Sequence, residues 1–229
     1  MTTDSYDSIE YKKLASWQNK IASERSDFSR QHSTVASEKQ IGRSIEKNIS
    51  LGNYAVAISL LDELIAHYPN GAINYNNRGL VYFRLARISK AIDDLNRAIA
   101  IDPKLDSAYN NRANCHAAVG NLVAALADYD LALDINPANL RAWINQGITY
   151  RQMKAYDLAI ENFEIALFLG NSLKAKIYAE RGRTYHLRGD WNCAVADYQT
   201  ALAMMSELPN KSDRKKVRSW LDELLEPLR

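Results

Sequence analysis

The sequence lacks several features that would each indicate a particular class of protein. Only two of its 229 residues are cysteines, Cys115 and Cys193, which are too few and too far apart for a disulfide framework. No run of 18 uncharged apolar residues occurs, and the first residues have neither the basic head nor the apolar stretch of an export signal. Lys and Arg number 29 against 27 Asp and Glu, so no basic excess points to nucleic acid. We therefore expect a cytoplasmic protein without a membrane span.

Motifs for covalent or metal chemistry are missing as well. The sequence contains no Gly-x-x-x-x-Gly-Lys-Ser/Thr loop, no Gly-x-Gly-x-x-Gly, no Gly-x-Ser-x-Gly and no His-Glu-x-x-His. No two of the four histidines lie three or four residues apart, and the neighbours Cys115 and His116 would point about 100° apart on a helix. His116 is expected to be a hydrogen-bonded residue of the core. The sequence therefore predicts no enzyme activity, no cofactor and no metal site.

What the sequence does contain is a regular repeat. Pro69, Pro103 and Pro137 follow one another at steps of 34 residues, and each comes after an apolar stretch. Because proline cannot continue a helix, each marks a helix end. Small residues, which let two helix backbones approach to about 8 Å, recur with almost the same period at Ala57, Ala91, Ala125, Ala159 and Ala194, and at Gly79, Ala113, Gly147 and Gly182.

This order of aromatic, small and proline residues resembles the tetratricopeptide repeat family, whose unit is a 34-residue pair of helices. The resemblance implies an all-α, right-handed α-solenoid of five helix pairs with capping helices at both ends. The Asn-Arg-Gly openings are similar to those of bacterial, particularly cyanobacterial, members. The fourth unit has no closing proline and one extra residue, so we expect a wider turn there. The units are expected at residues 38–71, 72–105, 106–139, 140–174 and 175–208.

Both ends of the chain are expected to be helical. In residues 1–37, four large apolar side chains, from Leu14 to Phe28, share one face of a predicted amphipathic helix. This helix has three possible roles: a cap on the first unit, an occupant of the groove, or a partner-binding element. In residues 209–229, an apolar stripe that includes Trp220 predicts a helix that covers the last repeat and presents a basic outer face.

A pattern of charges predicts contacts between the two helices of a unit. Arg78, Arg112 and Arg181 are each followed by an aspartate sixteen residues later, whereas Gln146 is followed at that distance by Asn162. We expect an ion pair within three units and a neutral hydrogen bond in the fourth, since a buried arginine without a partner would be costly.

In a solenoid of this kind the first helices line the concave side, where ligands bind. Asn77, Asn111 and Asn145 repeat there at steps of 34, and carboxamides both donate and accept hydrogen bonds, so they suit the main chain of an extended peptide. Similar asparagine ladders line grooves in this family, although asparagine is also a common polar surface choice. The candidate peptide-binding residues are Asn76, Asn77, Arg84, Asn110, Asn111, Asn114, Arg141, Asn145, Arg151, Lys176 and Arg183.

The predicted groove residues carry an excess of positive charge, with five cations against the single anion Glu180. This favours an acidic segment or an acidic C-terminus of a protein partner. The family's clamp for chaperone C-termini is matched only in part: Asn114, Asn145 and Lys176 fit it, whereas Asn110 and Glu180 replace its basic residues.

The functional prediction is a non-enzymatic adaptor, scaffold or assembly factor that binds protein. The alternatives are an RNA-binding helical-repeat protein, or a scaffold that self-associates through its N-terminal helix. Nucleic acid is disfavoured because regularly spaced exposed aromatic residues for base stacking are lacking.

Overall fold

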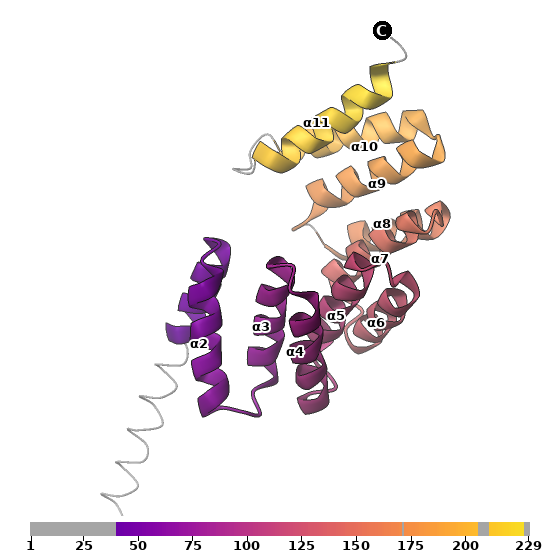
Figure 1. The fold of residues 1–229 in the computed structure, drawn as a ribbon. Helices are drawn as coiled ribbons and strands as arrows, with labels where there is room; N and C mark the ends of the chain where they lie inside the picture. The colour runs from indigo at the N-terminus through magenta and orange to yellow at the C-terminus, as the bar shows by residue number, and fades with distance from the viewer. Residues whose placement is uncertain (1–39, 171, 206–210, 227–229) are drawn as a thin grey trace, which may run out of the picture. The chain divides into compact units, whose positions relative to one another are not determined.

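The computed structural model describes residues 40–170, 172–205 and 211–226, and all regular secondary structure in these residues is helical. The chain divides into two units, Met1–Glu63 and Leu64–Arg229, and the boundary falls within helix α2 (Tyr54–His67). The all-α solenoid of helix pairs that the sequence predicts is confirmed for the described residues of Leu64–Arg229 (Figure 1). The helix predicted within residues 1–37 lies outside them.

In the first unit, a helical segment over residues 40–50 precedes α2. A tight turn joins the two, with Gly52 at a φ of 77° and the Asn53 backbone N–H donating to the Asn48 carbonyl at 2.8 Å. Ile45 and Ala57 are buried. The first helix of this unit therefore forms without the aromatic and glycine residues that open the later units.

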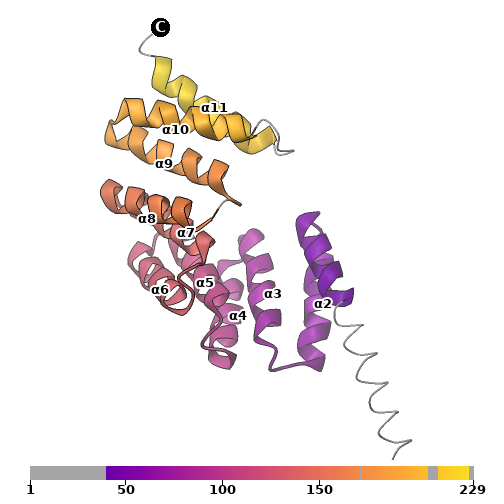
Figure 2. The ribbon, with the colours of Figure 1, turned by 180° about the vertical axis from the view of Figure 1, so that it is seen from behind.

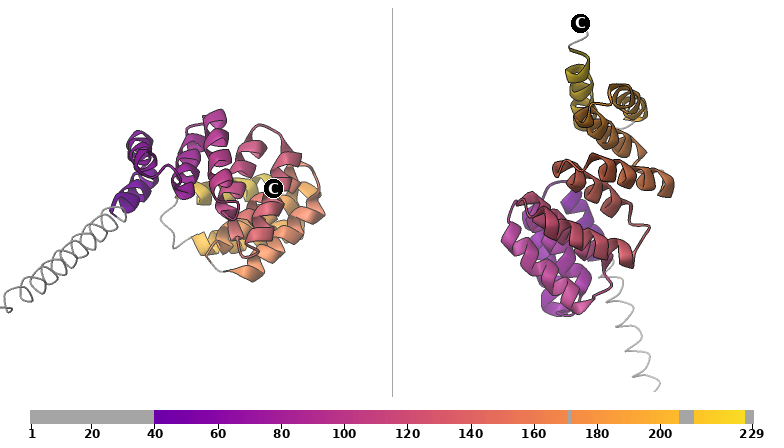
Figure 3. Two further views of the ribbon diagram at one scale, coloured as in Figure 1. Left: turned by 90° about the horizontal axis from the view of Figure 1, so that it is seen from below. Right: turned by 90° about the vertical axis from the view of Figure 1, so that its right-hand side faces the viewer.

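The described residues of the second unit form the last turn of α2, four helix pairs and α11. Within each pair the helices contact one another, and the second helix also contacts the first helix of the next pair (Figures 2 and 3). The first helices of neighbouring pairs touch as well, so they form a continuous row. The helices are α3 (Ala72–Arg84), α4 (Ile88–Ile101), α5 (Asp106–Ala118), α6 (Leu122–Ile135), α7 (Leu140–Gln152), α8 (Tyr156–Leu169), α9 (Lys174–Arg188), α10 (Trp191–Met204) and α11 (Lys211–Leu225).

The small residues of the repeat lie where two helices touch, as the sequence predicts. Every alanine of the recurring second-helix position is fully buried. At Gly147, an added Cβ would come within 2.9 Å of the Phe163 ring and 3.2 Å of the Ala159 carbonyl oxygen. Gly79 is equally crowded by Leu95. Glycine at this position therefore sets how closely the two helices of a pair approach.

The turn inside each pair repeats one backbone conformation that the sequence did not reveal. Its central residue has a left-handed φ in every unit: 55° at Ala86, 82° at Gly120, 62° at Lys154 and 97° at Gly189. Only glycine adopts this conformation without a steric cost. Ala86 and Lys154 are therefore held there by the surrounding helix pair.

The turns between pairs agree with the proline pattern. Helices α4 and α6 end two residues before Pro103 and Pro137. In the fourth repeat, which has no closing proline, α8 ends at Leu169 and is followed by the extended residue Gly170, whose φ is −170°.

The predicted C-terminal helix corresponds to α11, which packs on α10 and α9 (Figure 2). Its apolar side chains Val217, Leu221 and Leu224 are buried in one cluster with Tyr198 of α10. Lys215 and Arg218 are exposed on the other side of the helix. This helix therefore covers the core that the last pair would otherwise expose.

The three predicted arginine–aspartate pairs are present. Arg112 donates from Nε and Nη2 to the two carboxylate oxygens of Asp128 at 2.8 and 2.7 Å. The pairs Arg78–Asp94 and Arg181–Asp197 have the same two-bond geometry. The hydrogen bonds to Asp128 raise the pKa of the Arg112 guanidinium, even though burial opposes the charge. These paired hydrogen bonds fix the two helices in register in the pairs α3–α4, α5–α6 and α9–α10.

The predicted contact between Gln146 and Asn162 is wrong. Gln146 instead donates from Nε2 to Asp130, sixteen residues earlier in the preceding unit, at 2.6 Å. Asn162 donates to the Leu158 carbonyl of its own helix, and its buried Oδ1 has no partner among the described residues. A charged acceptor binds an N–H group more strongly than a neutral amide does, so Asp130 takes the glutamine donor.

Candidate functional site: a groove along the first helices

A groove with a volume of about 1010 Å³ runs along the first helices α3, α5, α7 and α9. Its wall contains the three asparagines of the predicted ladder, together with residues from the turns between units. Nine of the predicted peptide-binding residues line it: Asn76, Asn77, Arg84, Asn110, Asn111, Asn114, Arg141, Asn145 and Lys176.

Five of the lining asparagines form one chain of hydrogen bonds that crosses three helix pairs. Asn145 Nδ2 donates to Asn110 Oδ1 at 3.1 Å, and Asn110 donates to its neighbour Asn111 at 3.3 Å. Asn111 Nδ2 then donates to Asn76 Oδ1 at 2.9 Å, and Asn76 donates to Asn77 at 3.3 Å. We call these five side chains the amide chain, and the groove that they line the amide groove.

The amide chain leaves part of each carboxamide available for a ligand. A carboxamide has two N–H donors and two acceptor lone pairs, and each internal member of the chain uses one donor and one acceptor. Asn76 and Asn110 are nearly buried, whereas Asn77, Asn111 and Asn145 are partly exposed. The two nearly buried residues therefore hold the three more exposed residues in place.

Three of the predicted cations line the amide groove. Arg84, Arg141 and Lys176 are exposed, and none of them forms an ion pair within the described residues. The only acidic residue of the lining is Asp106, whose carboxylate accepts hydrogen bonds from Asn136 and Asn139 at 2.8 Å each. The lining therefore has a net positive charge.

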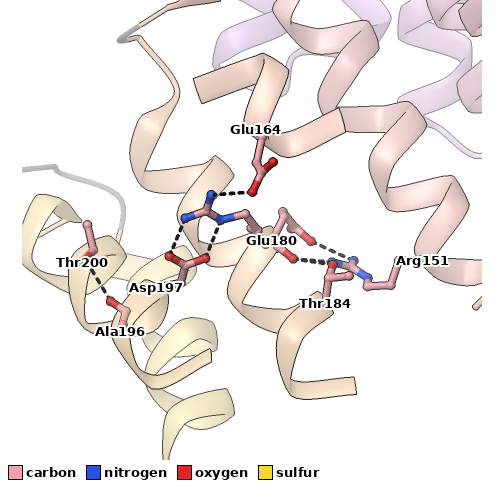
Figure 4. Close-up of polar contacts among 8 residues, drawn as sticks. Arg151, Glu164, Glu180, Thr184, Ala196, Asp197 and Thr200 are labelled. Atoms are coloured by element: carbon pink, nitrogen blue, oxygen red, sulfur yellow. Dashed lines mark hydrogen bonds and ion pairs between the residues drawn. The ribbon is translucent and has the colours of Figure 1, made fainter. Parts of the chain in front are cut away.

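The other two predicted cations, Arg151 and Arg183, do not line the amide groove and have acidic partners. Arg151 donates to the Glu180 carboxylate at 2.8 Å and to the Glu180 backbone carbonyl at 2.9 Å (Figure 4). Arg183 donates to Glu223 of α11 at 2.9 Å. Glu180, which the sequence marked as the one anion facing the groove, is therefore neutralised by a neighbouring helix.

Asn114 has a structural contact in addition to its place in the wall. The hydroxyl group of Tyr129, which is almost fully buried, donates to Asn114 Oδ1 at 2.7 Å. Burial strongly raises the pKa of Tyr129, so this hydroxyl stays protonated and remains a donor. The Oδ1 atom of Asn114 is thus already bonded to a hydroxyl group of the core.

Sequence reasoning missed the part of the lining that comes from the turns between units. Leu105, Asn139 and Leu173 precede three successive first helices at steps of 34 residues, and all three face the groove. Asn139 also caps α7, because its side chain accepts from the Ala142 backbone N–H at 3.1 Å. The 34-residue spacing would have identified this position.

The residues considered for metal or redox chemistry are dispersed. Cys115 is buried, and burial raises the pKa of its thiol to about 11, which keeps it protonated. The hydrogen bond expected for His116 is not found in the part of the chain that the structure describes, because its buried Nδ1 has no partner and its Nε2 lies 3.8 Å from Asp128 Oδ2. In that same part, no three His, Cys, Asp or Glu side chains gather in a possible metal site.

None of the helices in the described residues combines the length and the apolar composition that a membrane crossing requires.

The row of helix pairs and the groove along their first helices define an α-solenoid repeat protein. Models of the tetratricopeptide repeat match residues 72–105, 107–139 and 140–169. Over these residues, which make up less than half of the chain, the sequence is similar to the tetratricopeptide repeat. None of the curated proteins compared with the chain matches its sequence. The bacterial or cyanobacterial origin stays a prediction.

Solved structures of the same architecture resemble this chain. A thermophilic tetratricopeptide repeat protein from Thermus thermophilus is 20% identical with a TM-score of 0.70, over 82% of this chain and 99% of that chain. PilW, described as a widely conserved type IV pilus biogenesis factor, is 18% identical with a TM-score of 0.70, over 80% of this chain and 84% of its own. MamA is 21% identical with a TM-score of 0.59, over 71% and 95%. At these identities the likeness establishes the fold.

Tetratricopeptide repeats are modules of protein–protein interaction, so the match supports the broad class that the sequence predicts, a protein-binding scaffold. The ligand of the amide groove is a finer question, which depends on the chemistry of its lining.

Proposed function

We propose that this protein is a non-enzymatic scaffold that binds an extended, net acidic segment of another protein in the amide groove. The segment is either internal to its protein or an acidic C-terminus. The observation that carries the proposal is the lining of the groove, which combines the amide chain with three cations that form no ion pair within the described residues.

The amide chain suits the main chain of an extended peptide. Each residue of such a peptide offers one N–H donor and one carbonyl acceptor. The groove-facing carboxamides Asn77, Asn111 and Asn145 each retain donors or acceptors beyond those used in the amide chain. Main-chain pairing of this kind gives affinity without demanding a particular sequence.

The cations supply the charge preference. Arg84 is contributed by α3, Arg141 by α7 and Lys176 by α9, so the positive charge extends over several helix pairs. A segment with acidic residues spread along its length would contact all three at once. Such contacts at a partly exposed surface contribute mainly to selectivity and to the rate of association.

The proposal is tested with a displayed library of random twelve-residue peptides, selected on the purified full chain. We expect enrichment of sequences rich in Asp and Glu. The affinity of an enriched peptide is then measured by fluorescence anisotropy against a variant that carries Arg84→Glu, Arg141→Glu and Lys176→Glu. The matched control carries Arg97→Glu, Lys104→Glu and Lys215→Glu, which changes the net charge equally at exposed positions outside the groove.

We expect at least tenfold weaker binding in the groove variant and little change in the control. Asn77→Ala should weaken binding about fivefold, which corresponds to the loss of a hydrogen bond worth about 1 kcal/mol. Asn192→Ala, at an exposed position of α10, is its control. Equal losses in the two charge variants would refute groove binding. Tight, salt-sensitive binding of single-stranded RNA without any peptide enrichment would favour the RNA alternative.

A further inference from the structure

A second cavity, with a volume of about 320 Å³, is lined by residues of α7, α9 and α11 and by Met205, which follows α10. We call it the α11 cavity. It shares Lys176 with the lining of the amide groove, so the two hollows adjoin at this residue. Its lining residues are Ile148, Lys176, Ala179, Glu180, Met205, Asp213, Lys216, Val217 and Trp220.

The floor of the α11 cavity is apolar. Ala179, Met205 and Val217 are buried, with at most 6% of their surface exposed, and Ile148 and Trp220 are partly exposed beside them. Concave sites lined mainly by apolar side chains with a few polar groups at the edge are typical of ligand pockets. A floor of this kind gains free energy when a large apolar side chain replaces water there.

The charges at the rim favour an acidic neighbour for that side chain. Lys176 and Lys216 are exposed and form no ion pair within the described residues, and the Lys216 ammonium lies 4.7 Å from the centre of the Trp220 ring. Of the two acidic residues in the lining, Glu180 is already bonded to Arg151, and Asp213 also has an interaction of its own. Lys176 and Lys216 are therefore the charged groups of the rim that a ligand can contact.

We propose that the α11 cavity binds one large apolar side chain, of Leu, Met or Phe, from the same acidic segment that occupies the amide groove. The acidic residue next to this side chain contacts Lys176 and Lys216. The inference rests on the proposed function, because the segment must first run along the amide groove. It adds a sequence requirement that main-chain pairing and charge alone would not impose.

The selected peptides provide the first test. If the proposal is correct, the enriched acidic sequences share a Leu, Met or Phe at a fixed distance from the acidic run. Replacing that residue by Ala in an enriched peptide should weaken binding about tenfold in anisotropy measurements, as expected for the partial burial of an aliphatic side chain.

Two variants of the protein then assign this preference to the α11 cavity. Ala179→Met fills the cavity from its floor, and the control Ala127→Met adds the same side chain at an exposed position of α6. Lys216→Glu reverses a charge at the rim, and Lys215→Glu makes the same change on the neighbouring residue, which does not line the cavity. The melting temperature of each variant shows whether it is folded, and Lys216→Glu provides the test if Ala179→Met is not.

We expect Ala179→Met to bind the enriched peptide as weakly as it binds the Ala version, so that the tenfold difference disappears. Lys216→Glu should weaken binding of the enriched peptide several-fold relative to Lys215→Glu, because it repels the acidic residue next to the apolar side chain. An unchanged tenfold difference in a folded Ala179→Met, or equal binding by Lys216→Glu and Lys215→Glu, would overturn the inference and leave the proposed function standing. A wild type that is dimeric in light scattering, with an Ala179→Met variant that is monomeric, would also overturn the inference, because a second copy of the chain would then occupy the cavity. A library without any acidic enrichment would remove the proposed function and this inference together.

Discussion

The helix pair formed by α7 and α8 is the only one of the four in the second unit that lacks the arginine–aspartate pair, and this allows a direct exchange. Gln146→Arg and Asn162→Asp together would give this pair the residues that its neighbours have. In the preceding helix pair, α5–α6, Arg112 binds Asp128 within its own pair and Asn96 in the pair before. An arginine at position 146 could likewise bind an aspartate at position 162 in its own pair and Asp130 in the pair before.

The magnitudes follow from the surroundings of the two side chains. Asn162 is only 6% exposed, so Asn162→Asp alone buries a carboxylate without a partner and should cost about 2–3 kcal/mol. Gln146 is only 3% exposed, so Gln146→Arg alone places a larger, charged side chain in a packed site, with Asp130 as its acceptor, and should cost about 1–3 kcal/mol. In the double variant the new pair forms, and we expect a coupling energy of about 2 kcal/mol.

The assay is urea denaturation followed by the helical circular dichroism signal, on the wild type, the two single variants and the double variant. The matched control is the reverse exchange in the preceding unit, Arg112→Gln with Asp128→Asn, which should show a coupling energy of the same sign. Single effects that add to the double effect within about 0.5 kcal/mol would refute the reasoning that an ion pair forms at this position.

Three further predictions concern single positions. Lys154→Gly should raise the free energy of unfolding by about 1 kcal/mol in urea denaturation, because the left-handed φ of 62° costs nothing for glycine, and a destabilised variant would contradict this. Arg151→Met should lower it by about 1–3 kcal/mol by leaving the Glu180 carboxylate, 12% exposed, without its partner, and Glu180→Gln in the same chain should restore part of the loss. Burial lowers the pKa of His186, so the fold is stabilised at pH values above the ordinary histidine pKa, and this stability is lost as the pH falls. His186→Gln should therefore lose less stability between pH 7 and pH 5 than the wild type. Equal losses would show that His186 is not the source of the pH dependence.

The fold could be predicted because its causes are local and recur along the chain. Proline cannot continue the interior of a helix, and the crowding of Gly147 by Phe163 follows from two residues sixteen apart within one repeat. The left-handed turn was missed because Ala86 and Lys154 occupy a position where Gly120 and Gly189 would have revealed it. Two non-glycine residues were enough to hide the pattern.

The candidate site could be predicted less completely, because its contacts join different helices. Asn77 and Asn145 were expected to face the groove, but the bond between Asn111 and Asn76 joins residues 35 apart, which the 34-residue spacing does not suggest. The partner of Arg183 is Glu223, forty residues away and on the final helix. No regularity within the repeats could indicate that contact.

The contacts of Gln146 failed as a prediction for a related reason. The comparison of units considered only the residue sixteen positions later, whereas the side chain also reaches sixteen positions back. Arg112 does both, since it donates to Asn96 as well as to Asp128. Choosing between the two acceptors requires their charges and burial, which depend on how neighbouring pairs are packed.

This backward reach has a consequence for how the array comes apart. Arg112, Gln146 and Arg181 each contact an acceptor in the pair before their own: Asn96 at 2.8 Å, Asp130 at 2.6 Å and Glu164 at 3.8 Å. If one helix pair unfolds locally, its folded neighbour therefore loses a polar contact, and the apolar surface that the neighbour buried against that pair becomes exposed. Local opening is penalised, and amide hydrogen exchange in the middle of the array should occur through concerted opening of several adjacent pairs.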